Sequence, residues 1–364
     1  MMPGGVRTLI DRRSFMKAAG LPFLATLAPR SLFALERTDA VFASAFRGAD
    51  GGYGIATVSE AGQIIDRVTL PARAHGMAVS RVSGTVVAFA RRPGTFFMAL
   101  DPVGGREPIV VHTPDNRHFY GHGQFSPDGT ILYASENDFD GNRGVIGLYD
   151  ARDSFRRIGE YDAHGIGTHD MTVSDDGTMI VIANGGIETH PDFGRTKLNV
   201  DRMEPSLVLL DAATGQLVQK HTMPQKLQQL STRHVDLDGD GRIWFACQYE
   251  GPRNDLPPLV GYFSKGEDVT FMDLPEETTL RLANYVGAIA VNRKAGVVGL
   301  TSPNGNSAVE LDAKTGQVIS ETTVRDAAGV APSAKSVAVS SYDGLFETTR
   351  SNVAWDQHII RISR

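Results

Sequence analysis

Four histidines recur along the 364-residue chain, and each opens a similar stretch of sequence. His75, His122 and His169 are 47 residues apart, and His234 follows 65 residues further on. A neutral imidazole is a frequent protein ligand of zinc, copper and iron. If successive repeats bring these side chains together, they form a transition-metal site, and the nearby Glu136 could complete its ligand shell.

A structural role is the alternative for the same four histidines. A side chain that recurs at one position of a repeat can hold each repeat to its neighbour by a hydrogen bond to an adjacent loop. Because the spacing alone does not choose between a ligand and a structural anchor, both interpretations stay open at this point.

The repeated units show the alternation of apolar and polar residues that is typical of short β-strands. Each unit contains four such strands, joined by turns such as Ser126–Gly129 and Asp211–Gly215, in which Asp and Gly supply turn hydrogen bonds and positive φ. Two further units open at Val286 and at Lys335 without a histidine. Four strands in about 40–50 residues is the period of a propeller blade.

The strands of residues 41–70 form an incomplete unit, which brings the number of units to seven. Closure of the ring by the two termini would remove the open sheet edges that a linear array leaves. The sequence therefore predicts an all-β fold, a seven-bladed β-propeller with four-stranded blades, in a single domain over residues 35–364.

Most polar residues of the repeats fall on one face of such a propeller. The segment 185–206 has no strand pattern, and loops of more than about 12–15 residues are usually functional or disordered, so we expect it to cover the channel mouth as a lid. The candidate ligand-binding residues on this face are His75, His118, His122, Glu136, Asp138, His164, His169, Glu188, His190, Arg195, Lys197, Arg233 and His234. The candidate metal ligands among them are His122, Glu136, His164, His169 and His190, while Arg195, Lys197 and Arg233 are available for an anionic group.

The first 34 residues have the pattern of an export signal. Arg12 and Arg13 are followed by Phe15 and by an apolar run over 18–28 that is too short to span a membrane. A paired arginine in this setting is typical of twin-arginine signal peptides. The sequence predicts cleavage after Ala34 and a mature periplasmic protein without a membrane span.

The composition excludes several classes of protein. Hydrophobic residues make up 41% of the chain and charged residues 21%, as in globular rather than disordered proteins. A single cysteine excludes an intramolecular disulfide and every metal cage built from several cysteines. The formal net charge of -6 gives no reason to expect a basic face, so nucleic acid is not an expected partner.

Seven motifs are long enough to identify a family. They are Phe119–Gly129, Tyr133–Asp138, Ile158–His169, Ala183–Asn199, Met203–Leu207, Tyr285–Gly287 and Thr301–Gly305. Together they resemble the domain of unknown function 1513 family over most of residues 40–340. The resemblance implies a WD40/YVTN-like or quinoprotein-like propeller behind a twin-arginine leader, and no activity is established for the family. The chain departs from the family pattern in the segment 326–331, where Ala replaces Cys, and in a divergent last blade.

The resemblance also implies a biological setting. Members tend to be encoded beside imelysin-like iron-uptake proteins, which implies periplasmic iron handling with such proteins as partners. Our first expectation is thus a non-enzymatic periplasmic binding module that uses its His-rich face for a transition metal, namely iron, copper or zinc. A metal-dependent enzyme, such as a lyase or a lactonase-like hydrolase, would use the same face, and a purely structural interaction scaffold is the third possibility.

The export signal makes the first testable prediction. Replacement of Arg12 and Arg13 together by Lys should leave the uncleaved precursor in the cytoplasm, because the twin-arginine pathway recognises the arginine pair. Cell fractionation followed by immunoblotting measures the distribution. Normal accumulation of the double variant in the periplasm would contradict the predicted export route.

Overall fold

Seven four-stranded antiparallel sheets follow one another along the chain. The structure, a computed structural model, describes residues 39–102 and 105–363. Six of the sheets each use four consecutive strands. The first three are β4 (Ala74–Val79), β5 (Val86–Ala90), β6 (Phe96–Leu100) and β7 (Ile109–His112); β8 (Arg117–Phe125), β9 (Ile131–Asp138), β10 (Arg143–Asp150) and β11 (Arg156–Asp162); and β12 (Thr168–Val173), β13 (Met179–Asn184), β14 (Ser206–Asp211) and β15 (Leu217–Thr222). The next three are β16 (Leu230–Leu237), β17 (Ile243–Tyr249), β18 (Val260–Phe263) and β19 (Thr270–Phe271); β20 (Ala288–Asn292), β21 (Val297–Ser302), β22 (Ser307–Asp312) and β23 (Val318–Thr323); and β24 (Ala327–Pro332), β25 (Val337–Ser341), β26 (Leu345–Phe346) and β27 (Thr349–Arg350).

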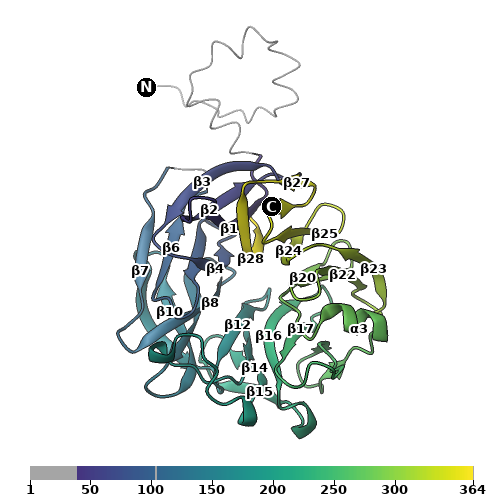
Figure 1. The fold of residues 1–364 in the computed structure, drawn as a ribbon. Coiled ribbons are helices and arrows are strands. Elements are labelled where there is room, and N and C mark those ends of the chain that lie inside the picture. Colours follow the sequence, from purple (N-terminus) through teal and green to yellow (C-terminus); the bar gives the residue numbers. More distant parts are fainter. Residues whose placement is uncertain (1–38, 103–104, 364) are drawn as a thin grey trace, which may run out of the picture.

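The seventh sheet joins the two ends of the described chain. In it, β28 (Val353–Arg361) pairs with β1 (Phe42–Gly48), and β2 (Tyr53–Val58) and β3 (Ile64–Leu70) follow outward. The first strands of neighbouring sheets contact one another from β4 through β8, β12, β16, β20, β24 and β28 and back to β4. The sheets therefore close into a ring, as Figure 1 shows, and a cavity described below occupies its centre. This confirms the predicted seven-bladed β-propeller and its closure by both termini.

Helical segments are short and lie outside the sheets. Within the described ranges, α3 (Glu276–Leu282) is the one α-helix, and there is a 3-10 helix η3 (Gln225–Leu227). The segment 185–206 contains the 3-10 helices η1 (Pro191–Phe193) and η2 (Val200–Arg202) and no strand before β14, as predicted. No helix among the described residues combines the length and the apolar character needed to cross a membrane. The predicted signal segment, residues 1–34, lies outside the part of the chain that the structure describes.

The tight turns form for the reason that their sequence indicates. In the turn between β8 and β9, the Asp128 carboxylate accepts hydrogen bonds from Ser126 Oγ at 2.5 Å and from the Thr130 amide at 3.1 Å. Gly129 follows with a φ of 69°, a conformation that costs glycine little. Asp176 repeats the arrangement in the next blade. These turns fix where each second strand begins and so keep the blades in equivalent registers.

Neighbouring blades are held together by apolar side chains between their faces. Phe97 of one blade packs against Phe119 and Tyr149 of the next, and Phe89 packs against Phe119, with ring centroids 5.1 to 5.8 Å apart. The closing strand contributes Trp355, which is fully buried and packs edge-on against Phe46 and Phe346. Aromatic pairs at these separations add to the burial energy of each ring, so the interfaces between blades form the core.

Two sequence-based assignments near the C-terminus are wrong. The seventh unit does not open at Lys335, because its first strand is β24 and the stretch after Lys335 forms the second strand, β25. The repeat assignment also gives no place to His358, although it lies in β28, the innermost strand of the closing blade. Both errors arise because the two-residue strands β26 and β27 are too short to show an alternating pattern.

The closing strand provides a test of the fold. Replacement of Trp355 by Ala should lower the free energy of unfolding by about 3–5 kcal/mol, because it leaves a cavity beneath the pairing of the two termini. The control is Ile319→Ala on the outer strand β23, where the side chain is 52% exposed and the change should stay within about 1 kcal/mol. Urea unfolding followed by circular dichroism measures both. Equal effects of the two substitutions would contradict the importance of this contact.

Candidate functional site in the central channel

The inner strands lose their regular register at one common level of the channel. In β12, His169 is an additional residue between the pairs Thr168–Asn184 and Asp170–Ala183. Register shifts occur at the corresponding places of β4, β8, β16 and β28. A β-bulge changes the direction in which neighbouring side chains point. The bulges therefore allow successive residues of one strand, such as His169 and Asp170, to contribute to the same site.

Five histidines meet at this level. They are His75 of β4, His122 of β8, His169 of β12, His234 of β16 and His358 of β28. Their ring centroids lie 4.5 to 6.0 Å apart across eight pairs. All four recurring histidines thus reach the centre of the channel, and His358 is a fifth member that the sequence analysis missed. Their registers are not identical, because His169 is the additional residue of β12, whereas in β16 the additional residue is Arg233 and His234 pairs with Ala246.

Two glycines make room for this cluster. A Cβ atom on Gly76 would lie 2.4 Å from the Gly121 carbonyl oxygen and 2.8 Å from His122 Nδ1. Gly121 itself has a φ of 107°, and a Cβ atom there would lie 2.9 Å from the His75 ring. Larger residues at either position would push the two inner strands apart. The motif around His122 is therefore rich in glycine because the strands approach closely there.

Asp170 orients two of the rings. Its Oδ1 atom lies 3.2 Å from His122 Nδ1, and its Oδ2 atom lies 3.4 Å from His234 Nδ1. A carboxylate can only accept, so both Nδ1 atoms carry the proton and both Nε2 atoms keep a free lone pair when the rings are neutral. The Nε2 atoms of His122, His234 and His358 are buried and have no hydrogen-bond partner in the structure. Three unpartnered ring nitrogens of this kind are unusual in a protein interior and point to a ligand.

Four of the five histidines have a lowered pKa, which favours their neutral form. Burial lowers the pKa of His234 to about 4, against the opposing effect of Asp170. Burial and the neighbouring rings and arginines lower the pKa values of His75, His169 and His358 well below the usual value. Burial alone would raise the pKa of Asp170, but its contacts with His122 and His234 hold that pKa well below its usual range. The cluster thus places these neutral imidazole rings next to one orienting carboxylate.

The five histidines form two overlapping groups with the dimensions of a metal site. The ligand atoms of His122, His234 and His358 lie within 4.8 Å of one another, and so do those of His75, His122 and His169. A three-histidine set that leaves one coordination position open is characteristic of catalytic zinc sites and is also compatible with copper and iron. Carboxylates that hold the second nitrogen of a ligating histidine, as Asp170 does, are the common outer partners of such sites.

Several predicted metal ligands lie elsewhere. The two histidine groups include His122 and His169 but not His164, which lies in the loop before β12 with a φ of 50°. His190 caps η1, where its Nδ1 accepts a hydrogen bond from the Asp192 amide. His118, predicted to bind a ligand, uses both ring nitrogens, one towards the Phe119 carbonyl and one towards the Asn137 amide. Hydrogen bonds to neighbouring groups therefore occupy both ring nitrogens of His118 and the Nδ1 atom of His190.

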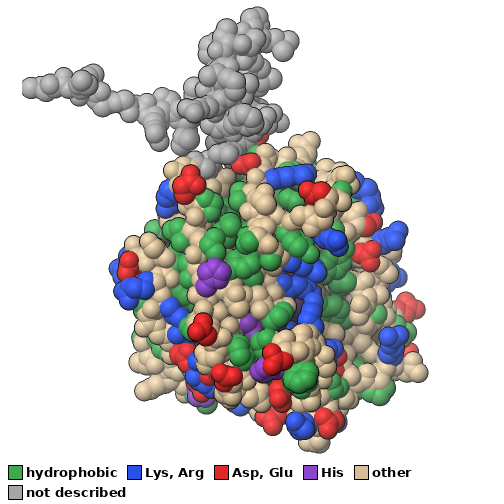
Figure 2. Space-filling view, turned by 60° about the vertical axis from the view of Figure 1, so that its left-hand side comes forward, with side chains coloured by type: hydrophobic (Ala, Val, Ile, Leu, Met, Phe, Trp, Pro, Cys, Tyr) green, Lys and Arg blue, Asp and Glu red, His purple; other side chains and the backbone are tan. Residues whose placement is uncertain are grey.

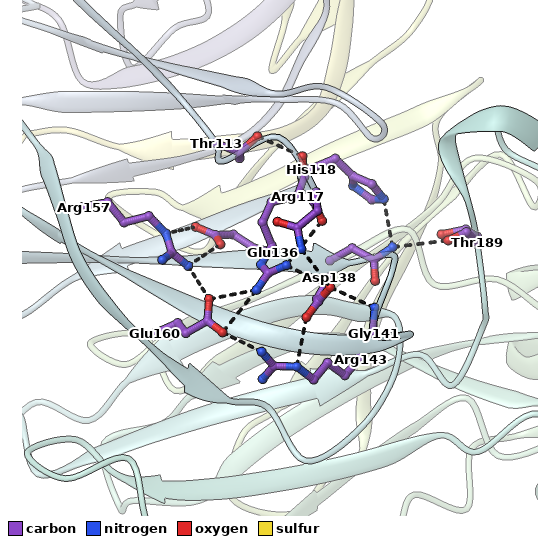
Figure 3. A network of polar contacts seen from close by, with 12 residues as sticks. Thr113, Arg117, His118, Glu136, Asp138, Gly141, Arg143, Arg157, Glu160 and Thr189 are labelled. Carbon is purple, nitrogen blue, oxygen red and sulfur yellow. Dashed lines mark hydrogen bonds and ion pairs between the residues drawn. The ribbon is translucent and has the colours of Figure 1, made fainter.

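The predicted ligands Glu136 and Asp138 belong to a separate ion-pair network, drawn in Figure 3. Asp138 lies 2.8 Å from Arg117 and 3.0 Å from Arg143. Glu136 is fully buried, where it accepts a hydrogen bond from Tyr149 at 2.6 Å and pairs with Arg157 at 2.9 Å. Glu160 completes the network by contacting all three arginines. Three arginines and three carboxylates balance one another, so this network holds the strands of one blade together.

The remaining predicted residues divide between two surroundings. Arg195 of the segment 185–206 and Arg233 of β16 line a small cavity above the histidines. This places part of the segment at the channel mouth, as expected of a lid. Lys197 pairs with Glu250, and Glu188 lies 3.9 Å from Arg202, so neither of these contacts involves the histidines.

Sequence reasoning missed the acidic residues of the site. Asp170 directly follows a recurring histidine, and Asp356 lies two positions before His358. Asp356 lies 3.2 Å from His75 Nδ1 and also pairs with Arg73 and Arg91. An acidic residue within two positions of each of several histidines is the signal that could have identified these partners.

The wide part of the channel leads to the histidines from the opposite face. A cavity of about 660 Å³ is lined by His122, Asp170 and His358 and extends to the hairpin turns at Ser126 and Ser174. Its volume falls in the range of small-molecule sites. The histidines therefore form a partition between this wide channel and the small cavity on the lid side.

The chain is similar in fold to several solved structures. It is similar to a hydrazine synthase chain of Kuenenia stuttgartiensis, with a TM-score of 0.60, 15% identity, and coverage of 86% of this chain and 92% of that one. The β-propeller domain of Cps50 (Swd1) from Myceliophteria thermophila gives a TM-score of 0.59 at 10% identity, with 84% and 91% coverage. A chain of a nidogen/laminin complex gives 0.53 at 10% identity, with 88% and 98% coverage. No functionally curated protein matches the sequence.

The described chain is therefore a seven-bladed propeller with a histidine cluster in its channel. It belongs to the family described as protein of unknown function DUF1513, whose pattern matches residues 68–362. The matched range covers the blades from β4 onward and β28, and thus the positions of all five clustered histidines.

The buried histidines predict a steep loss of stability in acid. Unfolded histidine takes up a proton below about pH 6.5, whereas folded His234 does so only near its lowered pKa of about 4. In between, the unfolded state binds more protons, so the free energy of unfolding falls with decreasing pH by about 1.4 kcal/mol per pH unit for each neutral histidine. Urea unfolding between pH 7 and pH 4.5 measures this slope.

A variant identifies the source of that slope. His234→Gln removes one of the titrating groups, so its stability should depend less steeply on pH than that of the wild type over the same range. An equal slope in both proteins would show that other groups cause the acid destabilisation.

Proposed function

We propose that the protein binds a transition-metal ion at the centre of the propeller, with His122, His234 and His358 as ligands. The observation that carries this proposal is the set of three buried Nε2 atoms that have no hydrogen-bond partner and belong to one compact group. Leaving a buried acceptor unpaired costs about 1–3 kcal/mol. A metal ion would occupy all three lone pairs at once, whereas a purely structural role would leave them unused.

The outer partners of the histidines support the same proposal. Asp170 fixes the protonated nitrogen of His122 and of His234, so these rings need no rearrangement before binding. In the second group, His75 Nδ1 lies 3.2 Å from both an Asp356 oxygen and an Arg91 nitrogen, so its protonated nitrogen is less clearly fixed. We therefore favour the group held by Asp170 as the primary site. His122 would be a ligand in either case.

The nature of the ligands narrows the choice of metal. Imidazole nitrogen suits iron, copper, zinc and nickel, whereas calcium and magnesium prefer oxygen ligands. Of these metals we propose iron as the natural ion, since members of the family tend to be encoded beside imelysin-like iron-uptake proteins. The protein would then act in the periplasm after twin-arginine export, with such an uptake protein as its partner.

A metal-dependent reaction is the second candidate function. The wide channel gives a small molecule access to His122 and His358. Asp236 lines the same channel, and burial raises the pKa of its carboxyl to about 6, close to the value useful for a general base. Asp236 also accepts hydrogen bonds from the Leu237 and Val291 amides. These bonds hold the carboxyl in place, so a hydrolase or lyase reaction would need the substrate to approach it along the channel.

Metal binding is tested by removing the histidine that both groups share. The protein is loaded separately with Fe(II), Zn(II) and Cu(II), and the bound metal is measured by elemental analysis after dialysis. The wild type should retain about one ion, and His122→Ala should retain none. The control His112→Ala changes an exposed histidine on the outer strand β7 and should retain the ion. Equal retention by both variants would exclude the channel as the site.

The orienting carboxylate gives a graded test. Asp170→Asn keeps all five histidines but replaces the carboxylate with a neutral amide, so metal affinity should fall by about 10- to 100-fold. Competition with a chromophoric chelator measures the affinity. An unchanged affinity would show that the metal is not held by His122 and His234 in the proposed orientation.

A further inference from the structure

Basic side chains crowd the lid side of the histidine cluster. A cavity of about 50 Å³ is lined by His75 and His169 on one side and by four arginines on the others, namely Arg91, Arg92, Arg195 and Arg233. Tyr120, Gln248, Tyr285 and Gln357 complete its wall. Lys and Arg side chains also gather in a hollow near the middle of the face seen in Figure 2. One water molecule needs about 10–15 Å³ of such space, so the cavity can hold more than a single water.

The acidic residues nearby do not balance these charges. Asp356 is shared by Arg73 and Arg91, and Glu250 is shared by Lys197 and Arg233. Within residues 39–102 and 105–363, Arg92 and Arg195 have no acidic partner. Asp170 lines the opposite, wide part of the channel rather than this cavity. The lid side of the channel therefore carries an excess of positive charge.

The arginines around this cavity lower one another's pKa values. Burial, together with Arg233, Arg195 and Arg91, lowers the pKa of Arg92 to about 10, against the opposing effect of Tyr120. Arg195 is brought into this group by the segment 185–206. In the network around Glu136 and Glu160, carboxylates balance the arginines and no such repulsion remains. An anion in the small cavity would relieve the repulsion among its arginines in the same way.

Unpaired polar atoms point to the same conclusion. The Nε atoms of Arg91 and Arg233 and the hydroxyl group of Tyr120 are buried without a hydrogen-bond partner of normal geometry. Tyr120 is only 2% exposed, and its ring lies beneath the Arg92 guanidinium at 5.9 Å. The three groups are donors, and a guanidinium offers paired N–H groups that match the oxygens of a carboxylate or a phosphate.

We propose that this cavity binds a small oxyanion, a phosphate or a carboxylate, directly beside the metal. His75 and His169 line the cavity and form the second metal-sized group with His122, which also belongs to the primary group. An oxyanion held by the arginines would therefore lie on the lid side of the histidines, next to the proposed metal ion. The placement beside the metal rests on the proposed function, whereas the oxyanion site itself does not. The species recognised by the protein would be a metal ion together with its anionic ligand.

The oxyanion site is tested on metal-free protein. Inorganic phosphate and, separately, acetate are titrated calorimetrically into the chelator-treated protein at low ionic strength. Arg92→Gln combined with Arg195→Gln should weaken binding of the preferred anion at least tenfold. The control combines Arg152→Gln with Arg156→Gln, two exposed arginines away from the channel, and makes the same change in net charge. Its affinity should stay within about twofold of the wild type.

A milder substitution keeps the test informative if the double arginine variant fails to fold. Tyr120→Phe removes one unpaired hydroxyl and keeps every charge, so it should weaken binding by about two- to tenfold. Whichever of phosphate and acetate binds more tightly identifies the class of the natural ligand. Absence of saturable binding of either anion, or equal affinities of the arginine variant and its control, would overturn the oxyanion site.

Loading with Zn(II) separates this inference from the proposed function. If the anion contacts the metal, the Zn-loaded wild type should bind it more tightly than the metal-free protein, and by linkage the anion should tighten metal binding equally. His122→Ala should lose the metal but keep the anion affinity of the metal-free protein. Anion binding that is unaffected by a bound metal would overturn only the placement beside the metal, whereas failure of metal binding alone would overturn only the proposed function.

Discussion

Pairing of β28 with β1 is the constraint on which the channel depends. It converts seven sheets into a closed ring, and the closed ring brings the inner strands β4, β8, β12, β16 and β28 to one centre. The same strand supplies His358 and Asp356, so closure and assembly of the site are a single event. Trp355 anchors this strand between Phe46 and Phe346 and fixes the height at which its polar residues enter the channel.

Around this centre, charge is arranged in layers. Neutral histidines form the partition, with Asp170 on the side of the wide channel and arginines on the side of the lid. Burial disfavours the protonated histidine, and the arginines disfavour it further. Asp170 is stabilised as an anion by the two rings that it orients. The arginines therefore help to keep the neighbouring ring nitrogens of His75 and His169 unprotonated.

Sequence periodicity predicted the ring and four of the five histidines, because a repeat places equivalent residues at equivalent depths. It could not predict His358, since β26 and β27 have two residues each and leave no period from which to count the last blade. Nor could it separate Glu136 from the site. Its partner Arg157 lies two strands away on β11, and a pairing of that kind depends on strand register rather than on residue type.

The position of His358 near the end of the chain affects when the site can exist. The other four clustered histidines are synthesised between 124 and 283 residues earlier, but the group that contains His358 is incomplete until β28 has been made and has joined β1. A nascent or truncated chain thus lacks one nitrogen of the site that Asp170 orients. Only a chain that has been synthesised through β28 and has closed its ring would present all three nitrogens of this group. A metal ion that binds there would therefore not be taken up by an incomplete chain.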